Sequence, residues 1–176
     1  MFDELAASLQ SGANRVELEI EGEDKLPWSL DFEYASARPA DDPQAPLRLS
    51  TRLASSSVEE GESVNLEIAL ENTSEEGLPM SLAIIGIPAG LAAPTEVLDD
   101  LKEAEAFDLW EIRGSELVLY WRDLAPRARE VVRIDLIARI PGTTTGPASR
   151  AYLYYSPDGR RWSEGLTIEV TAVEKR

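Results

Sequence analysis

Four pairs of adjacent carboxylates are the residues in this sequence that come closest to catalytic equipment. They are Asp41-Asp42, Glu59-Glu60, Glu75-Glu76 and Asp99-Asp100. Two carboxyl groups that converge on one substrate can hydrolyse a glycosidic bond as acid and base. Neighbouring residues in a strand point to opposite faces, however, and pairs in loops are solvated turn residues. The pairs therefore favour turns, and a carboxylate-based hydrolase is only the third of three functional hypotheses.

The sequence contains no cysteine and no histidine. This composition excludes disulfides, Cys/His zinc sites, thiol nucleophiles and a Ser-His-Asp triad. It also removes the commonest general base near neutral pH. No Asp-x-Asp-x-Asp-Gly pattern for calcium is present. We therefore predict a protein that is not an enzyme and that needs no metal and no cofactor.

The negative net charge disfavours two classes of binding partner, nucleic acids and anionic membranes. The chain has 176 residues, a formal net charge of −16 and a pI near 4.4. Such an acidic protein lacks the basic footprint that nucleic acids require, and it is repelled by anionic membrane surfaces. No apolar run approaches the ~20 residues of a membrane span. The N-terminus also lacks the basic region of a signal peptide.

Most of the chain alternates apolar and polar residues with the period of a β-strand. We predict strands over residues 47–53, 64–70, 79–87, 109–112, 117–121, 131–138, 150–156 and 166–173. Residues 141–147 and 156–159 are predicted to be a loop and a turn, because glycine and proline are frequent in both. The fold class is therefore all-β: an antiparallel sandwich, immunoglobulin- or jelly-roll-like, of about eight or nine strands.

One short helix is predicted within this sandwich, over residues 95–104. Pro94 and Thr95 give a start signal, with the Thr95 hydroxyl able to cap the first amides. An apolar stripe lies on one side of the helix and consists of Val97, Leu98, Leu101 and Ala104. The opposite side carries Glu96, Asp99, Asp100, Lys102 and Glu103. These five residues are the candidate partner-binding surface.

The domain organisation is predicted from composition. Residues 1–37 read as a small β unit, with alternating segments at 14–20 and 28–34 and a third strand or short helix at 2–9. Residues 38–46 contain Pro39, Pro43 and Pro46 and read as a stiff linker. Residues 47–176 form the large sandwich.

Two further motifs have a functional and a structural interpretation. Tyr152 and Tyr154 are predicted to share one face of a strand, which would suit a carbohydrate platform, although tyrosines also cover central strands. Asn72-Thr73-Ser74 matches a glycosylation sequon, which matters only in a secreted eukaryotic chain.

The order of several segments resembles the C-terminal receptor-binding domain of the alpha-2-macroglobulin family. The segments are Gly86-Ile87-Pro88-Ala89-Gly90-Leu91, the helix with Asp99-Asp100-Leu101, Leu117-Val118-Leu119-Tyr120, Ile137-Ala138-Arg139-Ile140-Pro141-Gly142 and Pro147-Ala148-Ser149-Arg150-Ala151-Tyr152-Leu153-Tyr154-Tyr155. The resemblance covers about residues 47–173. Residues 9–34 resemble the tail of the CUB domain that precedes this domain in the family.

The resemblance implies a fragment of a multidomain, thioester-type protease inhibitor, extracellular or periplasmic and bacterial. Its partners would be the thioester and macroglobulin domains of the same parent chain, and trapped proteases through the parent. In the animal proteins two lysines on this helix contact a receptor. Here the helix offers only Lys102 among four carboxylates, so receptor binding is not carried over and a structural, interdomain role is expected. The alternative is a free-standing extracellular sandwich that binds carbohydrate or a surface protein.

Overall fold

The computed structural model describes residues 10, 14, 15, 17, 19 and 36–173. The chain divides into two units, Met1–Tyr34 and Ala35–Arg176. The three elements predicted at residues 2–9, 14–20 and 28–34 lie almost wholly outside the described residues. The small N-terminal unit, the linker and their boundaries therefore stay predictions.

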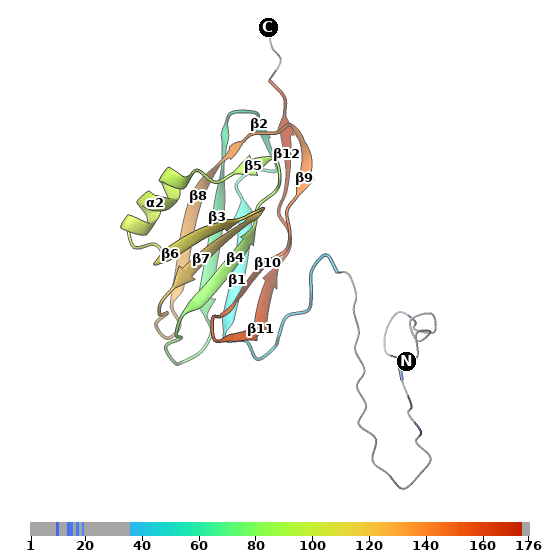
Figure 1. Cartoon of the computed structure of the whole chain (residues 1–176), viewed down its shortest axis with the longest axis vertical. Helices are drawn as coiled ribbons and strands as arrows, with labels where there is room; N and C mark the ends of the chain where they lie inside the picture. The colour runs from blue at the N-terminus through green and yellow to red at the C-terminus, as the bar shows by residue number, and fades with distance from the viewer. Residues whose placement is uncertain (1–9, 11–13, 16, 18, 20–35, 174–176) are drawn as a thin grey trace. The chain divides into compact units, whose positions relative to one another are not determined.

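Twelve strands and one helix make up the second unit (Figure 1). The strands are β1 (Leu47–Leu53), β2 (Ser57–Glu59), β3 (Ser63–Asn72), β4 (Ser81–Gly86), β5 (Leu91–Ala92), β6 (Leu109–Arg113), β7 (Glu116–Trp121), β8 (Arg129–Ala138), β9 (Gly142–Thr145), β10 (Ser149–Leu153), β11 (Ser156–Ser163) and β12 (Thr167–Thr171). The helix is α2 (Thr95–Glu103). The predicted all-β class is confirmed, and residues 36–173 contain the single helix that the sequence predicts there.

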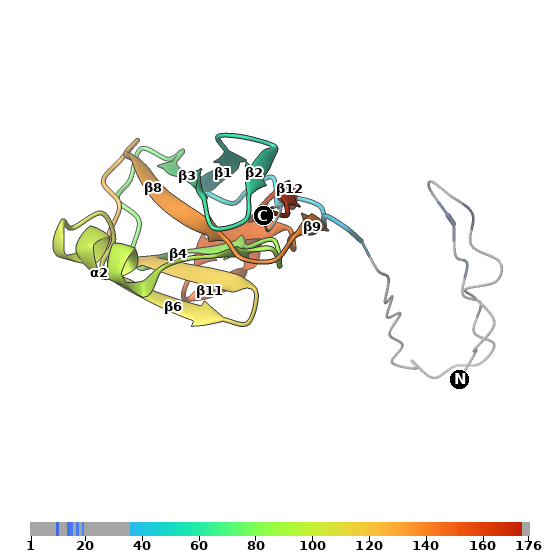
Figure 2. The ribbon, with the colours of Figure 1, turned by 90° about the horizontal axis from the view of Figure 1, so that it is seen from above.

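Two sheets form the sandwich, and Figure 2 shows them as layers. The strand order is β1-β3-β8-β5 in the first sheet and β11-β10-β4-β7-β6 in the second, and every pairing within them is antiparallel. A third, small sheet has the order β2-β12-β9, and its β2–β12 pair is parallel. Alternate residues of β3 and β8 enter the core, as expected for strands with one solvated face.

Strand β4 is buried on both of its faces. All six of its residues, Ser81–Gly86, are buried. Ala83 and Ile85 belong to the main core, whereas Leu82 and Ile84 belong to a second apolar cluster. A continuous apolar run is typical of such a central strand, which confirms the sequence-based expectation.

Four strands were missed by the periodicity, and each is explained by local chemistry. Strands β2 and β5 have only three and two residues. The predicted loop at 141–147 contains β9, where three successive β-branched threonines favour extended backbone. The predicted turn at 156–159 is wrong, because those residues begin β11. Pro157 is tolerated there because β11 is an edge strand.

Helix α2 begins where the sequence predicted but is capped differently. Pro94 takes the N-cap position, and no side chain bonds the first amides. The expectation that Thr95 caps the helix is wrong, because Thr95 is already the first helical residue and the N-cap position belongs to Pro94, whose side chain accepts no hydrogen bond. The apolar stripe faces inward at three of its four predicted positions: Leu98 is fully buried, and Val97 and Leu101 pack half-buried against the main core. Ala104 follows the end of the helix and is exposed, so its predicted place on the buried side is wrong.

Two tryptophans hold α2 and the segment after it against the second sheet. Trp110 Nε1 donates to Asp99 Oδ1 at 3.1 Å, and Trp121 Nε1 donates to the Ala106 carbonyl at 3.0 Å. Phe107 follows in the core with 2% of its surface exposed. Apolar burial and two indole hydrogen bonds therefore hold the helix and the segment after it in place. Such tertiary contacts are needed because a helix of this length is not stable in isolation.

Candidate interaction surface

The five predicted partner-binding residues all lie on the exposed side of α2. Glu96, Asp99, Asp100, Lys102 and Glu103 are all solvent-exposed. Asp99 also accepts the hydrogen bond from Trp110, so this side chain has a structural task as well. The surface carries four carboxylates and one ammonium, and its use by a partner stays a prediction.

The carboxylate pairs are explained by local structure. Asp41 Oδ1 accepts from the Trp162 amide at 2.6 Å, and Asp42 Oδ1 accepts from the Gln44 amide at 2.8 Å. Glu59 ends β2 and Glu60 follows it in the turn to Gly61, which has a positive φ of 89°. Within residues 36–173 and the few others described, no group of three acidic side chains could hold a metal ion.

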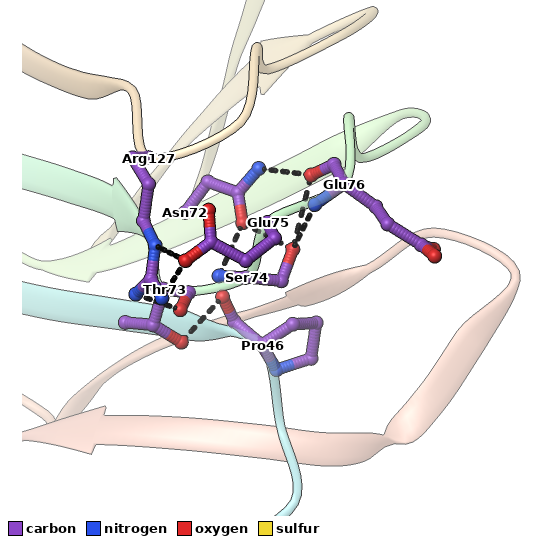
Figure 3. Close-up of polar contacts among 7 residues, drawn as sticks. All are labelled: Pro46, Asn72, Thr73, Ser74, Glu75, Glu76 and Arg127. Carbon is purple, nitrogen blue, oxygen red and sulfur yellow. Dashed lines mark hydrogen bonds and ion pairs between the residues drawn. The ribbon is translucent and has the colours of Figure 1, made fainter.

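Asn72 is the centre of a buried polar cluster rather than a glycosylation site (Figure 3). Its side chain has no exposed surface. Its Nδ2 donates to the Glu76 carbonyl at 2.7 Å and to the Ala125 carbonyl at 2.9 Å, and its Oδ1 accepts from the Ser74 hydroxyl at 2.7 Å. The sequon therefore ties the loop after β3 to the loop after β7, and its amide nitrogen is out of reach of a modifying enzyme.

Arg127 closes the same cluster from the outside (Figure 3). Its guanidinium donates to Glu75 Oε1 at 2.6 Å and to the Thr73 carbonyl. The hydrogen bond and the charge of Arg127 hold the pKa of Glu75 below its usual value. Arg127 adopts a left-handed φ of 58°, which is uncommon for a residue other than glycine. Its side-chain hydrogen bonds to Glu75 and Thr73 form in this unfavourable backbone conformation.

The outward face of the second sheet carries the second apolar cluster. Leu82, Ile84, Val118 and Tyr120 are buried there, with Met80 and Tyr152 packed against them. Arg160 covers the Tyr152 ring with its guanidinium carbon 5.7 Å from the ring centroid. A solvated sheet face is normally polar, so this apolar strip, covered by long polar side chains, distinguishes the second sheet from the first.

A three-membered network lies at the β6 side of this face. The Tyr120 hydroxyl donates to Glu111 Oε1 at 2.8 Å, and Arg113 Nε donates to Glu111 Oε2 at 2.8 Å. The Tyr120 hydrogen bond, followed by the Arg113 one, lowers the pKa of Glu111 below its usual value. Burial, and then the bond to Glu111, raises the pKa of Tyr120.

The lowered pKa of Glu111 predicts an acid-sensitive contribution to stability. A carboxyl group with a depressed pKa in the folded state stabilises the protein above its unfolded pKa of 4.5, and this stabilisation is lost as the pH falls through the folded value. Glu111→Gln is therefore expected to make the fall in unfolding free energy below pH 4.5 shallower. Urea denaturation from pH 3 to pH 7 measures this, with the exposed Glu105→Gln as control. Equal slopes for the wild type and Glu111→Gln would contradict the assignment.

A second ion pair spans the other half of this face. Arg150 on β10 donates from Nη1 to Glu116 Oε1 at 2.6 Å and from Nη2 to Oε2 at 3.3 Å, and each side chain is about a quarter exposed. The Arg150 guanidinium carbon also lies 5.8 Å from the Trp162 ring centroid. Bidentate geometry and partial burial make this the best-formed ion pair among the described residues.

Tyr152 and Tyr154 do not form the predicted platform. Strand β10 ends at Leu153, and Tyr154 and Tyr155 form the two-residue turn into β11. Tyr152 is half-buried in the second cluster, whereas Tyr154 and Tyr155 are 50% and 76% exposed. Their rings meet edge to face, with centroids 5.1 Å apart and planes at 79°, so the pair forms no continuous flat surface.

A groove of about 570 Å³ lies beside this turn, and we call it the tyrosine-turn groove. Its apolar and aromatic lining consists of Met80, Leu109, Tyr120, Tyr154 and Tyr155. Its charged lining consists of Lys102, Asp108, Glu111, Arg113 and Arg122. This groove has no continuous sequence pattern, because its residues come from four strands or their ends and from the helix. The only sequence signal was Tyr-Tyr directly before a proline-containing segment.

Comparison with known proteins gives a likeness of fold. No family model matches the sequence, and no curated protein matches it. Among solved structures, Escherichia coli alpha-2-macroglobulin from domain MG7 to the C-terminus superposes with a TM-score of 0.60 at 15% identity, covering 76% of this chain and 25% of that chain. Salmonella alpha-2-macroglobulin reacted with methylamine gives a TM-score of 0.59 at 19% identity, covering 76% of this chain and 10% of that chain.

The resemblance stated from the sequence is confirmed at the level of fold: this sandwich has the fold of the C-terminal region of bacterial alpha-2-macroglobulins. The chain spans a quarter or less of the length of these solved structures. Among the residues that the structure describes, no helix is both long and apolar enough to span a bilayer.

Proposed function

We propose that this chain is a non-catalytic C-terminal module of a macroglobulin-like protease-trapping protein, extracellular or periplasmic, and that its role is to pack against other domains of the parent chain. The observation that carries the proposal is the shared fold, found at one end of much longer polypeptides. The residues agree with a non-catalytic role, because three carboxylate pairs lie in or beside turns and loops and the fourth lies on α2, rather than at a common site.

The exposed side of α2 is the proposed contact with a neighbouring domain. The helix is docked through Leu98 and Asp99, so its outward carboxylates are held on a fixed support rather than on a mobile loop. Four carboxylates against one lysine favour a basic patch on the partner domain. This is opposite to the acidic receptor module that the animal proteins contact.

Crosslinking in the intact parent protein tests the proposal. Lys102 is the one lysine between residues 26 and 174, so an amine-reactive crosslinker reports on α2 without interference from nearby lysines. We expect crosslinks from Lys102 to upstream domains, and their loss in Lys102→Arg, which keeps the charge. A gene product without upstream macroglobulin domains, or no interdomain crosslink from Lys102, would refute the proposal.

The alternative is a free-standing sandwich that binds carbohydrate or a surface protein. The exposed Tyr154 and Tyr155 are the observation that favours it. Because the two rings meet edge to face, a sugar ring would find one flat aromatic face there rather than a continuous platform. Binding of this chain to a glycan array, lost in Tyr155→Ser, would establish the alternative.

A further inference from the structure

The outward face of the first sheet carries two rows of charged side chains that run across its strands. In each row a glutamate on β3 stands between an arginine on β1 and an arginine on β8. The rows are Arg48, Glu71 and Arg129, and Arg52, Glu67 and Arg133. We call the four arginines the arginine face. Four positive charges around two negative ones make it a basic patch on a chain of net charge −16.

The glutamates hold some of these arginines in place without covering them. Glu67 Oε2 accepts from Arg133 Nε at 3.1 Å and from Arg133 Nη2 at 2.8 Å, and Glu71 Oε2 accepts from Arg48 Nη1 at 2.8 Å. The Arg133 and Arg48 side chains nevertheless keep 62% and 67% of their surface exposed, against 27% and 30% for the two glutamates. Their guanidinium groups are therefore preorganised and still accessible, which lowers the entropic cost of binding a further anion.

The other two arginines carry charge that is weakly compensated. Arg52 approaches Glu67 only to 3.8 Å. The Arg129 side chain has no hydrogen bond or ion pair to any residue that the structure describes. They occupy opposite corners of the arginine face, because Arg52 is on β1 in one row and Arg129 is on β8 in the other. A guanidinium binds a carboxylate through two parallel N–H bonds, so each corner can accept one carboxylate.

Small side chains form a low floor between the two rows. The row between them consists of Ser50, Ala69 and Val131, and Ala69 is buried. Each charged row lies two residues from this floor, or about 7 Å along the strands. An extended segment that crossed the strands here would have arginines on both sides. Because successive side chains of an extended segment point in opposite directions, its carboxylates could reach both rows.

The interleaved glutamates select against a dense polyanion. A nucleic acid strand carries a charge about every 3.4 Å, so it would place negative charge over Glu67 and Glu71 as well as over the arginines. Carboxylates spaced along a polypeptide can match the arginines and avoid the glutamates. We infer that the arginine face binds an extended acidic segment of another protein. The inference does not depend on the proposed function, since this face lies on the side of the sandwich away from the second sheet (Figure 2).

Fluorescence anisotropy tests the inference with a defined probe. The probe is a fluorescein-labelled peptide in which glutamate alternates with threonine, and its control has glutamine in place of glutamate. The chain of 176 residues is expected to bind the glutamate peptide, more weakly as salt is added. Arg52→Glu is expected to weaken this binding roughly fivefold or more. Arg122→Glu is the matched control and is expected to change it less than about twofold. The two arginine side chains are both 77% exposed, and each has one long ion pair.

A second variant keeps the test independent of folding. Arg129→Gln removes a charge but no native ion pair, and it is expected to weaken the binding roughly threefold. Absence of binding, equal binding of the glutamine peptide, or equal effects of Arg52→Glu and Arg122→Glu would overturn the inference. Tighter binding to heparin or to anionic phospholipid vesicles than to the peptide would assign the face to another class of ligand and overturn it. Dimerisation of the chain that is lost in Arg52→Glu would assign the face to a second copy, with the same consequence.

Discussion

Replacing Leu98 with aspartate is expected to lower the free energy of unfolding of the sandwich by about 4 kcal/mol or more. Leu98 is the one fully buried residue of α2, and its side chain belongs to the main core. The substitution empties an apolar site and places a carboxylate there without a partner. Because the helix is too short to be stable alone, loss of this anchor would undock it.

Urea denaturation followed by tryptophan fluorescence measures this effect. Trp110 and Trp121 both bond to the helix or to the segment after it, so their emission reports on undocking. Thr95→Asp is the matched control, because it introduces the same side chain at an exposed position of the first turn, where negative charge is favourable. A Leu98→Asp variant as stable as Thr95→Asp would show that the helix does not support the core.

Gly86→Ala is expected to destabilise the sandwich by about 3 kcal/mol or more, since the added methyl group has no space. A Cβ atom at Gly86 would lie 2.0 Å from the Pro147 carbonyl oxygen and 2.7 Å from its carbon. These are backbone atoms, so no side chain can rotate away. The backbone at Gly86 is also held in place, because its amide donates a hydrogen bond to the buried Ser149 hydroxyl at 3.1 Å.

Gly77→Ala is the control for this substitution. Its Cβ would meet only the Leu124 carbonyl oxygen at 3.7 Å, which is an ordinary contact. Thermal unfolding of the two variants should therefore differ clearly, with Gly77→Ala close to the wild type and Gly86→Ala well below it. Equal melting temperatures would mean that the segment at Pro147 moves aside without cost.

The strong periodic segments of the sequence predicted most of the fold. The alternation in β1, β3 and β8 and the continuous apolar run of β4 placed these strands correctly. The stripe of Val97, Leu98 and Leu101 predicted the helix and its buried side. Very short strands were missed, because two or three residues do not establish a period.

The interaction surface was predictable only in part. The acidic side of α2 follows from helical spacing along one segment, so a sequence can show it. The tyrosine-turn groove depends on Met80, Leu109, Tyr120 and Tyr154, which meet only when β4, β6, β7 and β10 are aligned. The predicted Tyr152/Tyr154 face also failed because β10 ends at Leu153. Two more strand residues would have placed Tyr154 on the same sheet face as Tyr152.

Residues 41–45 cover part of the free edge of the second sheet. Strand β11 ends its sheet, and this segment occupies its free side: the Asp42 amide donates to the Arg160 carbonyl at 2.9 Å, and Asp41 receives the Trp162 amide. Ala45, at the end of the segment, is buried with 4% of its surface exposed. An uncovered edge strand is a template for pairing with another chain. The proline-rich segment therefore shields part of this edge, and a fragment that begins at Leu47 is expected to expose it to pairing with another chain.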